Sequence, residues 1–374
     1  MKKPSTSRFT PPKFNAERLR QVRNIIPPVP KRFKRVKSEE RIHEAFENIP
    51  RITNETVAEH REDVLKGARK YKYPLQHSKH KIVIYSTGLL ALAIVAFFIY
   101  TGLELYKFQS SSAFIYRVTQ VLPLPVARVG SHFVSYENYL FELRRYEHYY
   151  QTQQRVDFGG KDGKRQLATY KPVALHEVIN AAYVKQLAAR NHVRVSSAEV
   201  DEEIAALEAQ NQSSQKELAD VASNFFGWTL GDLKREVSQE LLAQKVAATL
   251  DTTAQAKANA VLVQLQNGAD FNALVAQYSD AADKDNNGGT YTDSAISLAS
   301  TDVPPAVVRQ LQKMQVGQVS DVVQAGDTLE IVKLTGNADG KLQAQHISFK
   351  LTGIAFYVGQ YQKAHPSHQY ISVD

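Results

Sequence analysis

The chain has 374 residues, with 46 Lys+Arg against 38 Asp+Glu for a formal net charge of +8, and it contains no cysteine. This length predicts two or three domains of ~100–200 residues each. The absence of cysteine excludes disulfides, thiolate zinc sites, iron–sulfur clusters and a cysteine nucleophile.

The charge is divided between two segments of opposite sign. Residues 1–81 carry 21 basic and 9 acidic residues, whereas the rest of the chain carries 25 basic and 29 acidic ones. A change of sign on this scale indicates that the two segments meet different surroundings. The net charge of the whole chain is therefore a poor guide to partners, and no specific nucleic-acid partner is predicted.

A candidate membrane helix separates these segments. Ile82–Leu103 is a run of 22 residues without a charge, which is long enough to span the ~30 Å hydrocarbon core of a bilayer. A buried helix of a soluble domain would carry a polar stripe, and this run has none. Basic residues crowd the segment before it, whereas Lys107 is the only one between it and Arg117. The positive-inside rule therefore places the N-terminus in the cytoplasm and the larger part of the chain outside.

Residues 1–81 form the predicted cytoplasmic tail. A cleaved signal peptide is not expected, because the apolar run is too long, the segment before it has 81 residues, and no small-x-small cleavage site follows. Within it, residues 1–37 contain Pro-rich and basic runs such as PPVPKRFKRVK, which favour disorder. Such a tail can contact anionic lipid headgroups, or act as a topology determinant without a specific partner, and both interpretations stay open. Residues 38–70 contain patterns typical of short helices.

The segment after the predicted membrane helix begins with a linker, residues 104–125, and continues as a helix-rich domain, residues 126–251. The sequence VARVG at its start is typical of a short strand and a turn, and Ser135 is placed to cap the following helix. Apolar residues then recur at i, i+3, i+4 and i+7 between Leu175 and Leu187, as on one buried helix face.

Two further helices of this domain are predicted from their first turns. Ser196 and Glu199 form a capping box in front of an apolar pattern. Thr229 precedes another apolar face, which ends near Leu250. The region shows few strand signals, so it is predicted to be a helical domain.

Residues 252–351 combine helical patterns with strand patterns, unlike the helical domain before them. Two helical patterns separated by Gly268 are followed by a turn at DNNGG and by PPAVVRQLQKM, a helix with proline in its first turn. GQVSDVV, DTLEIVKL and LQAQHISFKL are typical of strands. We therefore expect a small antiparallel α+β domain. Residues 352–374 are predicted to form a helix and a strand that pack back on the helical domain.

These segments resemble two known families. Residues 126–250 resemble the N-terminal chaperone domain of SurA-type and PrsA-type foldases, on VARVGSHFVSYENY, ALHEVINAAYVKQLAARNHVRVSSAEVDEEIAAL and FFGWTLGDLKREVSQELLAQKVA. Residues 252–335 resemble a parvulin-type (PpiC-like) peptidyl-prolyl isomerase domain, on VLVQLQNGADFNALVAQYSD, NNGG, VPPAVV, GQVSDVV and LEIVKL. The resemblance implies an α+β multidomain foldase in the cytoplasmic (plasma) membrane of a bacterium, with unfolded or proline-containing exported polypeptides as partners.

The parvulin pattern departs from the family at three places. Ala281 stands where the family usually has Cys or Asp after the Tyr-Ser-Asp turn, and Glu330 stands where it usually has a strand histidine. The opening strand of the family is also missing before the first helix. A similar strand, QAQHISF, lies instead after the last one, so we hypothesise a circularly permuted sheet with His346 beside Glu330.

The resemblance implies a site made of a polar cluster behind an apolar proline pocket. The candidate catalytic residues are Glu330, His346 and Asp280, and the candidate pocket walls are Val303, Val307 and Met314. Each of them also fits an ordinary role, as a cross-strand pair or as plain core. No cofactor or metal is implied, because the histidine-rich runs lack acids at ligand spacing.

Three functions stay open from the sequence. The first is a membrane-anchored chaperone with peptidyl-prolyl cis-trans isomerase activity. The second is a non-catalytic holdase with a degenerate parvulin domain. The third is an envelope scaffold that acts through its basic tail.

Overall fold

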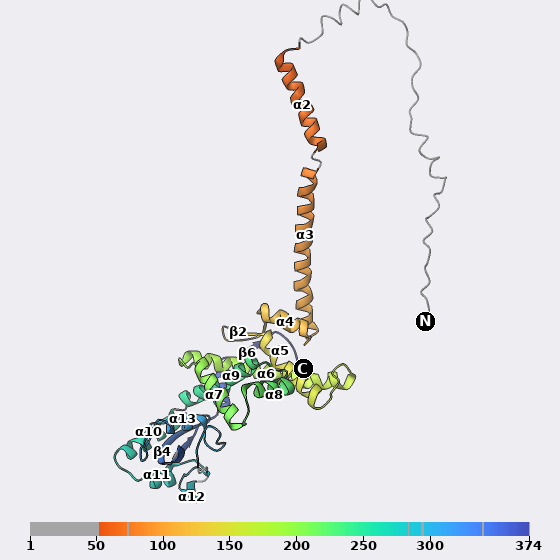
Figure 1. The fold of residues 1–374 in the computed structure, drawn as a ribbon. Coiled ribbons are helices and arrows are strands. Elements are labelled where there is room, and N and C mark those ends of the chain that lie inside the picture. The colour runs from red at the N-terminus through yellow and green to blue at the C-terminus, as the bar shows by residue number, and fades with distance from the viewer. Residues whose placement is uncertain (1–51, 73–74, 283, 293–294, 339, 374) are drawn as a thin grey trace, which may run out of the picture. The chain divides into compact units, whose positions relative to one another are not determined.

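The computed structural model describes residues 52–72, 75–282, 284–292, 295–338 and 340–373 (Figure 1). The chain divides at Gly88 into two compact units. In the first unit, α2 (Asn54–Lys72) lies in the segment that was expected to form short helices. The Pro-rich segment 1–37, expected to be disordered, lies outside the described residues.

Helix α3 (Leu75–Gly102) contains the predicted membrane span. It is the one helix among the described residues that is long and apolar enough to cross a bilayer, with a mean hydropathy of 2.5 over its most apolar 18 residues. None of those residues is buried in the protein, as expected for a helix without a polar stripe.

The segment 104–125, expected to be a linker, is instead part of the folded second unit. A π-helical turn, η3 (Leu103–Lys107), follows α3 directly, and α4 (Ala113–Val121) comes next. Leu105 and Ile115 are fully buried in the core of the helical domain. The short α4 begins at Ser112, whose side chain accepts a hydrogen bond from the N–H of Ile115.

The helical domain is built from five helices and a small sheet. The helices are α5 (Tyr136–Gln153), α6 (Lys161–Arg190), α7 (Ser197–Gln210), α8 (Gln215–Phe226) and α9 (Leu230–Leu250). The two predicted caps are confirmed: Ser135 caps α5, and Ser196 and Glu199 form a capping box at α7. Thr229 and Asp232 form a further capping box at α9, where only the apolar face had been predicted. These side chains satisfy N–H groups that a helix cannot pair internally.

The small sheet joins the two ends of the second unit. Strand β1 (Pro125–Val129) pairs with β2 (His132–Ser135) on one side and with β6 (Ser367–Gln369) on the other, both antiparallel. Helix α14 (Ile354–Ala364) precedes β6, and Val358, Ile371 and Val373 are buried in the core of the helical domain. The C-terminal segment therefore completes this domain.

The α+β domain has helices α10 (Thr252–Gln266), α11 (Phe271–Tyr278), α12 (Lys284–Asn287) and α13 (Pro305–Leu311). Its sheet has the order β3-β4-β5, with β3 (Val323–Ala325), β4 (Thr328–Ala338) and β5 (Lys341–Lys350). The expected strand at GQVSDVV is wrong for most of its length, since only a bridge from Val319 to Lys333 precedes β3. The expected α+β class, with a helical and a mixed domain, is confirmed.

The two faces of the β4–β5 hairpin carry different side chains, because successive residues of a strand point to opposite faces. Leu329, Ile331, Ile347 and Phe349 pack with α10 and α11. Val332 and Leu334, with Ala344, pack on the other face against the residues of α13. Glu330, His346 and Ser348 share the second face by this alternation. The end of that face nearest Thr328 is therefore polar, although it is buried.

Candidate functional site

A buried polar cluster is centred on the Glu330 carboxylate, whose residue is 3% exposed. Ser348 Oγ donates to Glu330 Oε1 at 2.8 Å, and Thr328 Oγ1 lies 2.8 Å from the same oxygen. His346 Nδ1 lies 2.9 Å from Glu330 Oε2. With Glu330 ionised, Nδ1 carries the proton and donates, because a carboxylate only accepts. The carboxylate thus has partners on both oxygens, as a buried charge requires.

The strand register explains why these residues meet. Glu330 is opposite Ser348, and Val332 is opposite His346, so Glu330 and His346 are diagonal neighbours, within reach of long side chains. The pairing of β4 with β5 that was hypothesised from the sequence is present. The His346 ring also stacks on Tyr291, with ring centroids 4.2 Å apart, so the ring is held on one side by an aromatic face and at Nδ1 by a carboxylate.

The loop after α11 forms hydrogen bonds with the part of β5 that carries this cluster. Ser279 is almost fully buried, and its Oγ accepts from the N–H of Ser348 at 3.1 Å. The N–H of Asp280 donates to the carbonyl of Ser348 at 2.7 Å, and Asp280 Oδ2 accepts from the N–H of Lys350 at 3.0 Å. Asp280 is therefore bonded to β5 and not directly to Glu330 or His346. Ser279 was missed by sequence reasoning, because a serine hydroxyl in a turn gives no signal without the strand register.

A cavity of about 370 Å³ opens in front of the cluster. Its lining residues are Asp280, Ala281, Ala282, Tyr291, Thr292, Asp302, Asp327, Thr328, His346, Ser348 and Lys350. The expected pocket walls Val303, Val307 and Met314 are buried in the core on the same sheet face and do not line this cavity. The alternative interpretation of these three residues as plain core fits their positions better.

The helical domain has a larger cleft of its own, of about 570 Å³, between β2, α5, α6 and α9. Apolar residues such as Val178 and Leu242 line it together with Glu142, Arg145 and Glu236. Burial raises the pKa of Glu142, although Arg145 Nε, 2.9 Å from its carboxylate, opposes the shift. Burial also raises the pKa of Glu236. The cleft therefore combines apolar surface with partly desolvated acids.

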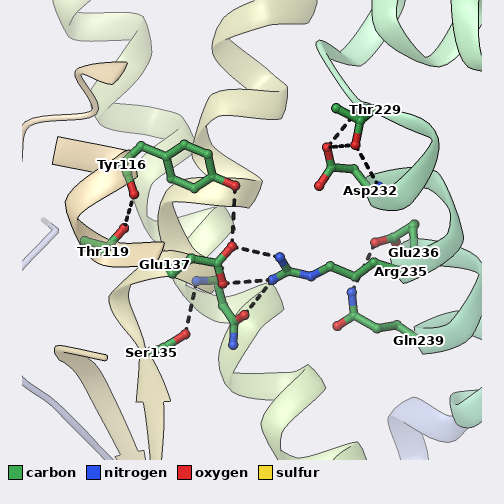
Figure 2. Close-up of polar contacts among 10 residues, drawn as sticks. Tyr116, Thr119, Ser135, Glu137, Thr229, Asp232, Arg235, Glu236 and Gln239 are labelled. Carbon is green, nitrogen blue, oxygen red and sulfur yellow. Dashed lines mark hydrogen bonds and ion pairs between the residues drawn. The ribbon is translucent and has the colours of Figure 1, made fainter. Parts of the chain in front are cut away.

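One arginine holds the walls of this cleft together. Figure 2 shows Arg235, from α9, reaching Glu137 at the start of α5, where two guanidinium nitrogens lie 2.8 and 3.2 Å from the two carboxylate oxygens. Its Nη2 also donates to Asn138 Oδ1 at 2.6 Å, and its guanidinium lies over the Phe141 ring at 4.2 Å. Tyr116, from α4, approaches the same carboxylate at 3.4 Å. Three helices thus meet at one ion pair.

Two family models match neighbouring parts of the chain. A model described as SurA-like N-terminal domain matches residues 75–247, and the Rotamase model, described as PPIC-type PPIASE domain, matches residues 239–336. This chain joins a SurA-like N-terminal domain to a PPIC-type PPIase domain. The SurA-like match begins at the first residue of α3. The PPIase match ends before β5, the strand that carries His346.

Two curated proteins that are similar in sequence to part of this chain bear the name chaperone SurA. The one from Methylobacillus flagellatus is 34% identical over 116 residues, which cover 29% of this chain and 25% of the relative. The one from Albidiferax ferrireducens is 30% identical over 122 residues, which cover 30% of this chain and 26% of the relative. The chain thus matches only about a quarter of the length of these relatives.

Among the described residues, no group of three or more His, Asp or Glu side chains is arranged to hold a metal ion. What the PPIase domain offers is a cavity with a fixed imidazole, a carboxylate and two hydroxyls at its back. Such an arrangement suits non-covalent binding and polarisation of a peptide group.

Proposed function

We propose that this chain is a membrane-anchored extracytoplasmic foldase, which binds unfolded or proline-containing exported polypeptides and catalyses cis-trans isomerisation of their Xaa-Pro bonds. The observation that carries the proposal is the buried Glu330–His346 pair behind an open cavity in a PPIC-type domain. The relatives named chaperone SurA support the proposed role as a chaperone, since part of their sequence is similar to part of this chain.

The reaction needs no covalent step. Rotation about a peptide bond has a barrier of ~18–20 kcal/mol because the C–N bond has partial double-bond character. The cavity lowers this barrier if it binds the twisted amide better than the planar one. Glu330 fixes the His346 ring, and Ser348 and Ser279 fix the strand beneath it. The polar back wall is therefore pre-organised, and no reorganisation is needed when the amide twists.

The SurA-like domain supplies the client-binding surface in this proposal. An unfolded segment would place apolar side chains against the lining of the cleft and its backbone near polar groups such as Asn138 and Gln186. A mixed lining of this kind suits many sequences. Binding near the PPIase cavity would raise the local concentration of prolyl bonds there.

The anchor is α3, supported by its length, its apolar composition and its exposed surface. The proposed orientation has the N-terminus in the cytoplasm of a bacterium, since basic residues precede the helix. Fusion of a periplasm-dependent reporter enzyme to the C-terminus tests this orientation. Reporter activity is expected for the full chain, and its loss is expected when residues 82–103 are deleted.

The catalytic part is tested by NMR exchange spectroscopy on a short Xaa-Pro peptide with the full-length chain in nanodiscs. Wild-type protein is expected to accelerate exchange, and Glu330→Gln and His346→Ala are expected to lower the rate at least tenfold. Thermal melting of each variant separates lost catalysis from lost folding. Lys313→Ala, outside the cavity lining, serves as a control.

A second function, that of a non-catalytic holdase, is favoured by the two substitutions of the family pattern at Ala281 and Glu330. It predicts no acceleration by the wild-type chain, together with suppression of the aggregation of an unfolded client. Both results together would replace the isomerase proposal.

A further inference from the structure

The mouth of the PPIase cavity carries an excess of negative charge. Among the described residues that line it, Asp280, Asp302 and Asp327 are acidic, and Lys350 is the one lysine or arginine. Asp327 and Lys350 are exposed, as is Asp280. A substrate that enters the cavity therefore meets carboxylates before it reaches the buried cluster.

Two of these carboxylates are held in place by hydrogen bonds. Asp302 Oδ2 accepts from the N–H and the hydroxyl of Thr292, at 3.2 and 2.6 Å. Asp280 Oδ2 accepts from the backbone N–H of Lys350 at 3.0 Å. Hydrogen bonds of this kind orient a carboxylate without cancelling its charge. In the described part of the chain, the Lys350 ammonium makes no ion pair within 4 Å with either of them, so it does not neutralise them by contact.

The third carboxylate, Asp327, lies in the turn between β3 and β4, next to Gly326 with its φ of 64°. The three acids thus come from three separate loops: the turn after α11, the segment before α13, and the β3–β4 turn. They surround the mouth and do not converge as metal ligands, since none of them belongs to a group that could hold a metal ion.

The back of the cavity does not offset this charge. Glu330 is satisfied by hydroxyl groups and by His346, and all of these lie inside the buried cluster. Even with His346 protonated, the pair adds no net positive charge to the cavity. Among the described lining residues, three carboxylates therefore stand against one ammonium.

We infer that this cavity selects Xaa-Pro segments with a lysine or arginine beside the proline, and disfavours segments with an acidic or phosphorylated residue there. The inference rests on the proposed isomerase function and deepens it. A cation a few ångströms from one or two of these carboxylates is attracted, and an anion is repelled, with a strength that falls with salt. Across a partly solvated mouth we expect a threefold to tenfold preference for Lys over Glu.

The experiment uses the full-length chain in nanodiscs and three peptides of sequence Ala-Xaa-Pro-Phe, with Lys, Gln or Glu at Xaa. NMR exchange spectroscopy gives the rate of isomerisation, and titration of fluorescently labelled peptides gives the Kd. The test variant is Asp327→Asn, because the described structure shows no hydrogen bond or ion pair of its side chain. The matched control is Asp321→Asn, which removes an exposed carboxylate outside the cavity lining.

We expect rates and affinities in the order Lys, Gln, Glu, with the spread reduced about threefold by Asp327→Asn or by 0.5 M NaCl and unchanged by Asp321→Asn. Equal affinities for the Lys and Glu peptides would overturn the inference while leaving the isomerase function intact. If no peptide is isomerised, the catalytic proposal fails, and the order of the Kd values still decides the inference. Absence of binding to every peptide overturns both.

Discussion

Replacing Arg235 by alanine gives the sharpest test of how the SurA-like domain is held together. The side chain is 31% exposed and that of its partner Glu137 is 17% exposed. Exposed ion pairs contribute ~0–1 kcal/mol, whereas breaking a buried pair costs ~3–5 kcal/mol. This pair is intermediate in burial, but it has two nitrogen–oxygen contacts and stacks on Phe141. We therefore expect Arg235→Ala to lower the free energy of unfolding by about 2–3 kcal/mol.

The single tryptophan of the chain provides the assay. Trp228 stacks on Phe141, with centroids 5.6 Å apart and planes 6° apart, so its emission reports the unfolding of this part of the domain. With a slope of ~1–3 kcal/mol per M of urea, the loss corresponds to a midpoint shift of about 1 M for the chain in detergent micelles. Arg235→Lys keeps the positive charge but cannot make the two parallel nitrogen–oxygen contacts of the guanidinium group. We therefore expect it to lose about half as much stability as Arg235→Ala.

The matched control is Lys234→Ala, one residue away on the same helix. Lys234 pairs with Asp201 at 2.6 Å, but the two side chains are 35% and 59% exposed, so a loss below ~1 kcal/mol is expected. A double-mutant cycle with Glu137→Gln isolates the pair from other effects. If Arg235→Ala shifts the midpoint no more than Lys234→Ala does, the ion pair does not hold α9 to α5 and the reasoning is wrong.

Three further predictions follow from individual contacts. Hydrogen bonds from Lys245 and from the Ser196 backbone lower the pKa of Glu199 from 4.5 to about 2, so its contribution to stability is present above pH ~4.5 and is lost as the pH falls towards 2. Acid unfolding monitored by circular dichroism should show this loss, and Glu199→Gln should remove it. A Cβ at Gly289 would lie 2.5 Å from a β5 carbonyl, whereas one at Gly317 meets nothing within 4 Å, and both have positive φ. Thermal melting should therefore show a larger loss for Gly289→Ala than for Gly317→Ala, and equal losses would contradict the packing argument. Deletion of residues 352–374 removes three buried apolar side chains worth ~1.5–3 kcal/mol each, so limited proteolysis should find the SurA-like domain unfolded, and a protected domain would refute this.

Local signals in the sequence were sufficient for much of the fold. These signals involve only residues that are close together in the sequence. They are the charge-free run of 22 residues and the first turns after Ser196 and Thr229. They predicted a spanning helix and the starts of α7 and α9. The pairing of β4 with β5 was also predicted, from the resemblance of QAQHISF to the opening strand of the family.

The missed features depend on contacts between distant segments. Residues 104–125 look like a linker because they end in Leu-Pro-Leu-Pro and because α4 has only nine residues. They become structured because Leu105 and Ile115 fill a core supplied by other helices. Val303 likewise looks like a pocket wall, and only the packing of α13 on the sheet places it in the core.

The cluster around Glu330 shows where family resemblance reaches its limit. The resemblance predicted that Glu330 and His346 matter, and the β4–β5 register brings them within 2.9 Å. Ser279 and Ser348 escaped attention because serine is common in turns and strands. Their role depends on a register that no single segment of sequence contains.

The position of β5 after β4 also bears on how one domain is placed inside another. An antiparallel sheet requires only that two strands be neighbours. A short hairpin between β4 and β5 has a lower entropic cost of loop closure than the long connection that a strand placed before α10 would need. Because β5 is the last strand of the PPIase domain, the first and last residues of this domain lie close together. Asp251 Oδ1 accepts from the N–H of Ala254 at the start of α10, and Oδ2 accepts at 2.7 Å from Thr352, just after β5. The PPIase domain is thus inserted between α9 and α14 through two adjacent connections tied by one carboxylate. This geometry lets α14 and β6 complete the SurA-like core, and it gives a physical reason for the permuted order hypothesised from the sequence.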